Sequence, residues 1–343
     1  MKVLIVKMSS LGDVVHTLPA VTDAARIRPE ISFDWVVEEG FASVAELHPA
    51  VDKVIEIAIR RWRKHPFKSM HEFAEFRKQL RSTDYDLILD AQGLIKSASV
   101  VLMARGKSGG YAFGSARESL ASLAYQFRIE TPVNVHAIEK IRYLFAQLLD
   151  YDVPTAAADY GLALKQSTTP NRQVMFLHGT TWPSKHWPLD YWRELVRLST
   201  AAGYHVLLPH GNDEEKARAQ QIASAGSGAE VMAPVRIADL IGSMRQCEGV
   251  VCVDSGLGHL AAALELPLVG IYGPTDPGLT GPVARNREIL ASDHLPCIPC
   301  LSGKCRFDRA EVTGAYPPCF RPVDAERVWE AFIKQVEPRV QVP

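Results

Sequence analysis

The chain has 343 residues, with 38 lysines and arginines against 39 aspartates and glutamates and a formal net charge of -1. This balance excludes a general electrostatic attraction to nucleic acid or acidic lipid, so any such contact needs a local patch. The length exceeds what one hydrophobic core usually serves, which predicts two domains. No apolar run reaches the length of a secretory signal or a membrane span, which predicts a cytoplasmic protein without a transmembrane segment.

The first half of the chain alternates short apolar strands with helical patterns, as a parallel sheet requires. The pattern predicts strands at 3–6, 33–37, 54–57 and 87–89, a helix from about 14 toward 28, and a long helix at 135–149. Residues 150–170 contain little helical or strand periodicity. We interpret them as the linker between the two halves of the chain.

The second half repeats the same alternation. It predicts strands at 174–177, 205–208, 250–253 and 268–272, with helices at 190–202, 213–224, 237–246 and 257–266. Beyond Pro282 the pattern loosens, and a last helix is predicted at 323–336. We therefore predict an α/β protein of two Rossmann-like, doubly wound domains that face each other across a cleft, with boundaries at 1–165 and 172–322. The remainder, 323–343, is expected to form a C-terminal helix packing back toward the first domain.

Asp13 stands on the turn Ser9-Ser10-Leu11-Gly12-Asp13, directly after the first predicted strand. Open parallel sheets bind their ligands at the carboxyl ends of their strands, which is where this turn lies. The carboxylate is suited to cap the following helix and equally suited to act as a general base. The residues alone leave both interpretations open.

Asp254, Ser255 and Gly256 end the apolar strand 250–253 and begin a helical pattern. Free backbone N–H groups and the helix dipole at such a terminus favour a phosphate group. In the alternative interpretation, Asp254 merely caps the helix and Gly256 merely tightens the turn.

Two further loops of the second half also follow strands. Residues 178–187, HGTTWPSKHW, bring hydroxyls, backbone N–H groups and the Lys185 ammonium to a point where a diphosphate could bind, although the two tryptophans could equally belong to a core. The acids in 211–215, GNDEE, either complement a helix dipole or accept ribose hydroxyls. The second half therefore favours a nucleotide.

Residues 60–68, RRWRKHPFK, form the only dense basic run. Such runs are usually solvated faces, but Trp62 and Phe67 could anchor this one and leave its guanidinium groups free for a carboxylate or phosphate. Arg117 could join the same patch. This predicts an anionic substrate for the first domain, which the protein would meet at a membrane surface.

Four cysteines, Cys297, Cys300, Cys305 and Cys319, lie in the loosely patterned region after Pro282. Four thiolates in so short a span suit a tetrahedral zinc or a single iron with a structural role. In the alternative, they are free cysteines in an exposed loop. Cys247 and Cys252 lie in or beside a buried strand and are expected to stay metal-free.

Several long segments of the chain resemble the heptosyltransferase group of the GT-B glycosyltransferases. These segments are VLIVKMSSLGDVVHTLPA, FDWVVEEGFA, IRRWRK, LDAQGLIKSA, the TT-x-x-x-KHWP loop, and VDSGLGHLAAAL followed by YGPTDPGL. The resemblance covers nearly the whole chain. It implies the GT-B fold and inverting transfer of L-glycero-D-manno-heptose from ADP-heptose to Kdo of the lipopolysaccharide inner core, with Kdo2-lipid A as acceptor.

The resemblance also implies roles for individual residues. Asp13 is the implied general base. The implied ADP-heptose site consists of Thr180, Thr181, Lys185, Glu215, Asp254, Ser255, Gly256 and His259, and the implied acceptor site of Arg60, Arg61, Arg63, Lys64 and Arg117. No cofactor is required for catalysis, and the enzyme is expected to be peripheral on the cytoplasmic face of the inner membrane.

Two alternatives stay open. In the first, the same donor site serves an enzyme that transfers heptose to a second core heptose or to a protein. The cysteine cluster bears on this choice of acceptor, because the lipid A core enzymes that the chain otherwise resembles lack it. In the second, the chain is a non-catalytic module that binds a nucleotide sugar. Such a module would not need a general base at Asp13.

Overall fold

A computed structural model describes residues 1–162 and 171–337 of the chain. The chain divides into a first compact unit that ends at Ala163 and a second that begins at Leu164. The expected boundary at 165 falls outside the described residues. Among the helices of the described part, none is both long and apolar enough to cross a bilayer.

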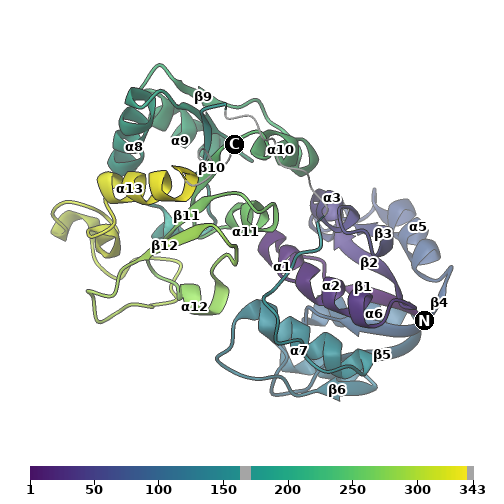
Figure 1. Ribbon diagram of the computed structural model, residues 1–343. Helices are drawn as coiled ribbons and strands as arrows, with labels where there is room; N and C mark the ends of the chain where they lie inside the picture. The colour runs from purple at the N-terminus through teal and green to yellow at the C-terminus, as the bar shows by residue number, and fades with distance from the viewer. Residues whose placement is uncertain (163–170, 338–343) are drawn as a thin grey trace. The chain divides into compact units, whose positions relative to one another are not determined.

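The first unit is built on a parallel sheet of six strands in the order β3-β2-β1-β4-β5-β6 (Figure 1). Its strands are β1 (Lys2–Val6), β2 (Ser32–Glu38), β3 (Val51–Ile57), β4 (Asp84–Asp90), β5 (Arg105–Tyr111) and β6 (Phe127–Ile129). Its α-helices are α1 (Leu11–Val15), α2 (Leu18–Ile27), α3 (Ala42–Glu46), α4 (Ile59–Trp62), α5 (Met70–Leu80), α6 (Ile95–Met103) and α7 (Ala137–Leu149). Because β1 lies inside the sheet, its apolar residues 3–6 are fully buried.

The second unit repeats this plan in the strand order β12-β11-β10-β7-β8-β9. Its strands are β7 (Gln173–Leu177), β8 (His205–Leu208), β9 (Ala229–Val231), β10 (Gly249–Val253), β11 (Leu268–Tyr272) and β12 (Arg287–Ala291). Its α-helices are α8 (Leu189–Ala201), α9 (Asp213–Ala223), α10 (Ile237–Met244), α11 (Gly256–Ala263), α12 (Pro277–Thr280) and α13 (Ala325–Val336). The prediction of two doubly wound α/β units is confirmed.

Some elements differ from their predictions for local reasons. The helix expected from 14 toward 28 is two helices, α1 and α2, which break at His16 and Thr17 just before Pro19. Proline lacks an N–H group and is favoured in the first turn of a helix, so it marks a start here. Strand β5 was not predicted from the sequence, because it is rich in glycine, a residue type that is depleted in strands. A Cβ atom at Gly110 would lie 2.6 Å from the Tyr125 ring, so packing requires glycine there.

The closing helix α13 packs inside the second unit. Val328, Phe332 and Val336 belong to its buried core, and the helix contacts α8, β10, β11 and β12. Its apolar face is therefore used in the core of the second unit. That this helix also packs back toward the first domain stays a prediction.

Candidate active site

The strand order of each sheet determines which loops meet. In the first unit, successive strands are added to one side of β1 up to β3 and to its other side from β4 onward, so the strand order reverses between β1 and β4. In the second unit it reverses in the same way between β7 and β10. Ligands of doubly wound sheets bind outside the carboxyl ends of the strands at such a reversal. The turn after β1 holds Asp13, and the loops after β7 and β10 hold Lys185 and Asp254. Each predicted centre thus lies at the switch point of its own sheet.

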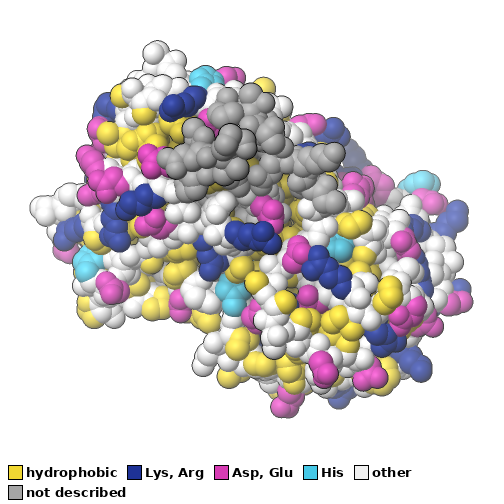
Figure 2. All heavy atoms as spheres, in the orientation of Figure 1, with side chains coloured by type: hydrophobic (Ala, Val, Ile, Leu, Met, Phe, Trp, Pro, Cys, Tyr) yellow, Lys and Arg dark blue, Asp and Glu magenta, His cyan; other side chains and the backbone are white. Residues whose placement is uncertain are grey.

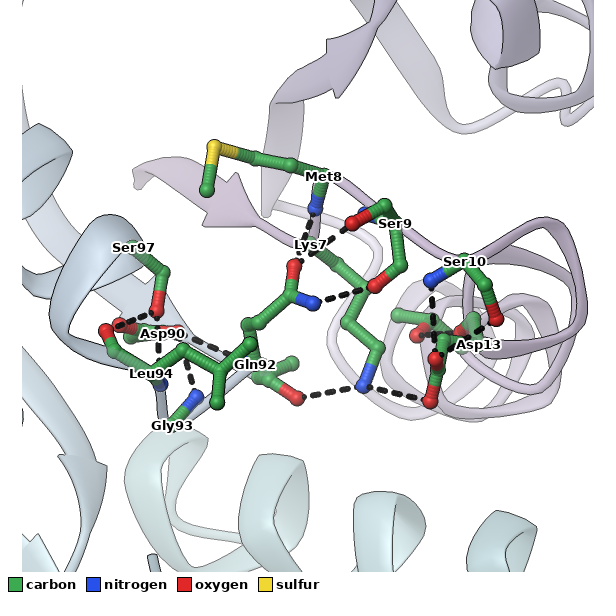
Figure 3. A network of polar contacts seen from close by, with 12 residues as sticks. Lys7, Met8, Ser9, Ser10, Asp13, Asp90, Gln92, Gly93, Leu94 and Ser97 are labelled. Carbon is green, nitrogen blue, oxygen red and sulfur yellow. Dashed lines mark hydrogen bonds and ion pairs between the residues drawn. The ribbon is translucent and has the colours of Figure 1, made fainter. Parts of the chain in front are cut away.

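Asp13 lies in the first turn of α1, with its carboxylate folded back over the turn (Figure 3). Its Oδ2 atom accepts hydrogen bonds from the backbone N–H of Ser10 at 2.8 Å and from the Ser10 hydroxyl at 2.9 Å. The carboxylate therefore caps the helix, as one of the two interpretations predicted. Since its side chain stays 31% exposed, it also remains accessible to a substrate.

A buried ammonium lies beside this carboxylate. Lys7 Nζ is 3.6 Å from Asp13 Oδ1 and donates a hydrogen bond to the Ala91 carbonyl at 2.8 Å. Burial alone would raise the pKa of Asp13, but the charge of Lys7, the two hydrogen bonds from Ser10 and the charge of His16 together lower it to about 2. Asp13 is therefore ionised at neutral pH, as a general base must be.

The loop after β4 holds the turn that carries Asp13 (Figure 3). Gln92, which is buried, accepts hydrogen bonds from the N–H groups of Met8 at 2.7 Å and Ser9 at 3.2 Å, and its amide donates to the Ser9 carbonyl. The carboxylate of Asp90 in turn accepts the Gln92 N–H at 2.8 Å. Sequence reasoning did not single out Lys7 or Gln92. The feature that could have identified them is their position just after β1 and β4, two strands that are neighbours in the sheet but distant in the sequence.

The predicted basic residues have different surroundings. The Arg61 guanidinium is bound by Glu39 at 2.9 Å and by Glu72 at 2.7 Å, so its charge is already neutralised. The Arg60 guanidinium lies over the Phe41 ring at 5.6 Å. Arg63, Lys64 and Arg117 are exposed. The run at 60–68 is therefore not a uniform cationic surface.

In the second unit, Lys185 and Asp254 form an ion pair. Lys185 Nζ lies 2.7 Å from Asp254 Oδ2 and 4.6 Å from the centre of the Trp182 ring. Asp254 also accepts a hydrogen bond from Thr275 at 2.6 Å, and its carbonyl accepts one from Thr180 at 3.0 Å. The loops after β7 and β10 and the segment after β11 therefore meet at one point. Sequence reasoning missed Thr275, which lies in the quoted YGPTDPGL segment.

Ser255 and Gly256 begin helix α11. Ser255 is the N-cap residue in extended conformation, and its hydroxyl is buried without a hydrogen-bond partner. A buried hydroxyl without a partner is costly, and a ligand that accepts its hydrogen bond would remove that cost. His259 is buried one turn along the same helix. This helix terminus therefore fits the predicted phosphate site.

Glu215 lies where the loops after β7 and β8 meet. Its Oε2 atom accepts the Gly211 N–H at 2.6 Å. A Cβ atom built at Gly179 would come within 3.0 Å of the Glu215 carboxylate, so the two segments are in close contact. Thr181, two residues after Gly179, is exposed. The carboxylate is thus at a strand end, as a partner of ribose hydroxyls would be.

The four cysteines after Pro282 line one small pocket of the second unit. Burial, together with the neighbouring Cys305, Cys300 and Cys297, raises the pKa of the Cys319 thiol to about 12. Within residues 1–162 and 171–337, no three His, Cys, Asp or Glu side chains are arranged to hold a metal ion. The spacing of the cysteines in sequence therefore does not by itself yield a formed metal site. Cys247 and Cys252 are buried elsewhere.

The two units share one strand order. One has an ionised carboxylate at its switch point, and the other has a helix terminus suited to phosphate. This combination is that of a GT-B glycosyltransferase. A structure of the Escherichia coli heptosyltransferase WaaC with ADP matches this chain with a TM-score of 0.80 and 43% identity, covering 85% of this chain and 94% of that one. The GT-B fold predicted from the resemblance is confirmed.

The family model for glycosyltransferase family 9 (heptosyltransferase) matches residues 73–311. The chain therefore belongs to this family of heptosyltransferases. It is 44% identical over 341 residues to lipopolysaccharide heptosyltransferase 1 of Pseudomonas aeruginosa, a match that covers 96% of both chains. The protein of the same name from Escherichia coli K12 is 44% identical over 296 residues, covering 84% of this chain and 93% of the relative.

Proposed function

We propose that this protein transfers L-glycero-D-manno-heptose from ADP-heptose to a Kdo residue of the lipopolysaccharide inner core, with inversion at the anomeric carbon. The observation that carries this proposal is the ionised Asp13 carboxylate on the turn after β1, in a chain of the heptosyltransferase family. The name shared by the relatives at 44% identity supports the substrate class.

Asp13 is the general base in this proposal. Its carboxylate accepts the proton of the acceptor hydroxyl while the hydroxyl oxygen forms a bond to the anomeric carbon of heptose. The bond from that carbon to the phosphate oxygen breaks in the same displacement, and ADP leaves with the electron pair. Ser10 and Lys7 hold the carboxylate in place through contacts at 2.8 and 3.6 Å.

The second unit holds the donor. The N–H groups at the start of α11 and the Ser255 hydroxyl bind phosphate oxygens, and Lys185 stabilises the charge that develops on ADP, a role that a divalent ion has in other sugar transferases. Glu215 accepts ribose hydroxyls. Thr180, Thr181 and His259 complete the donor contacts, while Asp254 orients Lys185 through their ion pair at 2.7 Å.

A comparison of three acceptors tests the proposed substrate. Purified protein is incubated with ADP-heptose and either Kdo2-lipid A, the same lipid already carrying one heptose, or a protein acceptor. We expect a mass gain of one heptose on Kdo2-lipid A alone. Transfer only to the heptosylated lipid or the protein would support the competing acceptors, and ADP-heptose binding without transfer to any of them would support a binding module.

The acceptor site uses Arg60 more than Arg61. The Arg61 guanidinium is already neutralised by Glu39 and Glu72, whereas no ion pair is recorded for Arg60 within the described part of the chain. We expect Arg60→Ala to raise the KM for Kdo2-lipid A about 10-fold or more, as the loss of one charge-assisted contact does. Arg61→Ala should change it about 2-fold. Equal effects in steady-state kinetics would contradict this division.

The acceptor is a lipid, so we propose that the protein works as a peripheral protein on the cytoplasmic face of the inner membrane. Beside α4, the side chains of Phe67 and Met70 are 88% and 66% exposed. Figure 2 shows lysine, arginine and histidine side chains, together with acidic ones, over the edge where Figure 1 places α5. Exposed aromatic and basic side chains side by side favour contact with an anionic lipid surface.

We also propose a structural zinc or iron on Cys297, Cys300, Cys305 and Cys319, supported by the soft donor set that lines one pocket. The thiols would have to draw together around the ion, and metal would displace their protons. This ion would have no part in heptose transfer.

Elemental analysis tests the metal proposal. Protein purified without chelator should contain close to one zinc or iron per chain. Cys300→Ser should lose the metal and melt at a lower temperature, whereas Cys247→Ala should keep the metal, because Cys247 lies outside the pocket. A wild-type protein without metal and with all four thiols open to alkylation would show that these are free cysteines.

A further inference from the structure

Residues 301–304, the 301–304 tip, belong to the cysteine-bearing segment and contact the loop after β7 that carries Lys185. The Ser184 hydroxyl donates a hydrogen bond to the Ser302 carbonyl at 2.5 Å, and the Ser184 N–H donates to the Gly303 carbonyl at 3.2 Å. Ser184 is 3% exposed, so both bonds lie in a poorly solvated environment, where hydrogen bonds are stronger. The tip therefore fixes the backbone directly before Lys185.

The 301–304 tip also contacts the segment after β11. The Leu301 N–H donates a hydrogen bond to the Pro274 carbonyl at 2.9 Å. Pro274 precedes Thr275, whose hydroxyl donates to the Asp254 carboxylate at 2.6 Å. The tip therefore joins the segment that holds Asp254 to the loop that carries its ion-pair partner, Lys185.

Leu301 has a backbone conformation that leucine rarely adopts. Its φ angle is +48°, in the left-handed region that favours glycine. The side chain is 60% exposed, so burial of the leucine does not require this conformation. It is the conformation in which the Leu301 N–H reaches the Pro274 carbonyl. Because backbone strain of this kind concentrates at ligand sites, it favours a functional role for the contact.

The side chain of Trp182 connects the tip with the Lys185 ammonium. Lys185 Nζ lies 4.6 Å from the centre of the Trp182 ring. A Cβ atom built at Gly303 would lie 3.8 Å from the same ring, so the tip lies against it. The Lys185 N–H also donates to the Trp182 carbonyl at 2.9 Å. Groups that the tip contacts therefore support Lys185 both at its backbone and at its ammonium.

An ordered lysine binds a diphosphate more tightly than a mobile one. The lysine side chain is long and flexible, and it loses much conformational entropy when a ligand orders it. Where the protein has already ordered the side chain, ligand binding does not have to overcome this loss. The charge-assisted contact to phosphate then contributes more of its strength to affinity. An element that orders Lys185 should therefore raise the affinity for a nucleoside diphosphate.

We propose that the 301–304 tip positions Lys185, through Ser184 and Trp182, for the diphosphate of the sugar donor. This inference rests on the proposed function, in which Lys185 stabilises the departing ADP. Ser184, Trp182 and the tip are positioning elements, because they act through Lys185 and need not touch the donor themselves. The cysteine-bearing segment thus has a role at the donor site whether or not its thiols hold a metal ion.

Calorimetry with ADP tests this inference in a double-mutant cycle. Ser184→Ala removes the hydroxyl that binds the tip and should weaken ADP binding about 3- to 10-fold, as the loss of one hydrogen bond does. In the Lys185→Ala background the same substitution should cost no further affinity, because Ser184 acts through Lys185. Ser199→Ala is the matched control. Ser199 is a buried serine of α8 in the same unit, its hydroxyl donates to the Leu195 carbonyl at 2.7 Å, and its loss should leave ADP affinity unchanged.

Two pairs of variants test the tip and the ring separately. Leu301→Pro lacks the N–H group that binds Pro274 and cannot adopt a positive φ, so it should weaken ADP binding as Ser184→Ala does. Leu301→Gly keeps the N–H group and suits this φ, so it should retain the affinity. Trp182→Leu removes the ring beside the Lys185 ammonium and should weaken ADP binding about 2- to 10-fold, whereas Trp182→Phe should retain most of the affinity.

Thermal melting shows whether each variant is folded. Wild-type ADP affinity in Ser184→Ala would overturn the inference, and so would an equal further loss in the Lys185→Ala background, which would leave Ser184 as a general support of the second unit. If Ser184→Ala does not fold, Leu301→Pro and Trp182→Leu decide, and wild-type affinity in either of them would overturn the inference. Because calorimetry uses ADP alone, it tests the inference even if the wild type transfers heptose to no acceptor and the proposed function fails. A wild type that does not bind ADP would contradict both.

Discussion

Replacing Asp13 by asparagine is expected to lower kcat by about 10²-fold or more while ADP affinity stays near that of the wild type. The asparagine side chain keeps the shape of the carboxylate and can still accept the hydrogen bonds from Ser10. It cannot accept the proton of the acceptor hydroxyl. Because that proton moves only in the transition state, the loss should appear in kcat and leave donor binding intact.

The measurement is initial-rate kinetics at saturating ADP-heptose and acceptor, with calorimetry for ADP. Asp84→Asn is a suitable control, since Asp84 is an exposed acid at the amino end of β4, opposite the switch point. It should behave as wild type. Turnover of Asp13→Asn at the wild-type rate would remove Asp13 from the mechanism and return it to the role of a helix cap.

Replacing Lys185 by alanine is expected to weaken ADP binding by about 10- to 100-fold, because the variant loses a charge-assisted contact to the diphosphate. The same change leaves the carboxylate of Asp254, whose side chain is 8% exposed, without its ion-pair partner. An unpaired buried charge is unfavourable, so the free energy of unfolding should fall, by up to about 3 kcal/mol. Thr275 still donates a hydrogen bond to Asp254, which limits the loss.

Calorimetry and thermal melting of Lys185→Ala, Lys185→Arg and Lys216→Ala separate these effects. Lys185→Arg keeps the charge beside Asp254 and should restore stability. Lys216→Ala removes an exposed charge from α9 of the same unit and should change neither quantity. If Lys185→Ala melted early but bound ADP as tightly as the wild type, Lys185 would be a structural partner of Asp254 and not a donor ligand.

The strands at the centre of each sheet could be predicted from the sequence because burial on both faces leaves a continuous apolar run. β11 was predicted with its observed bounds, Leu268–Tyr272, and β1 to within one residue. β5 could not be predicted in this way. A Cβ atom at Gly109 or Gly110 would come within 2.6 Å of the Leu148 or Tyr125 side chain, and both of these residues lie later in the chain.

The candidate sites show the same limit. Lys185 and Asp254 were each assigned to the donor site, but their ion pair follows only from the placement of β7 next to β10. Gln92 gave no local signal, since its contacts with residues 8 and 9 depend on β4 lying next to β1. Sequence patterns therefore locate the strand ends that carry chemistry, and the order of the strands determines which side chains meet there.

The most direct test of the proposed function is to express this protein in a bacterium whose own lipopolysaccharide heptosyltransferase 1 has been deleted, and to determine the mass of the core attached to lipid A. We expect the wild-type chain to restore heptose on Kdo, and Asp13→Asn, present at the same level, to leave the core ending at Kdo. A core without heptose in cells that contain folded wild-type protein would contradict the proposed function.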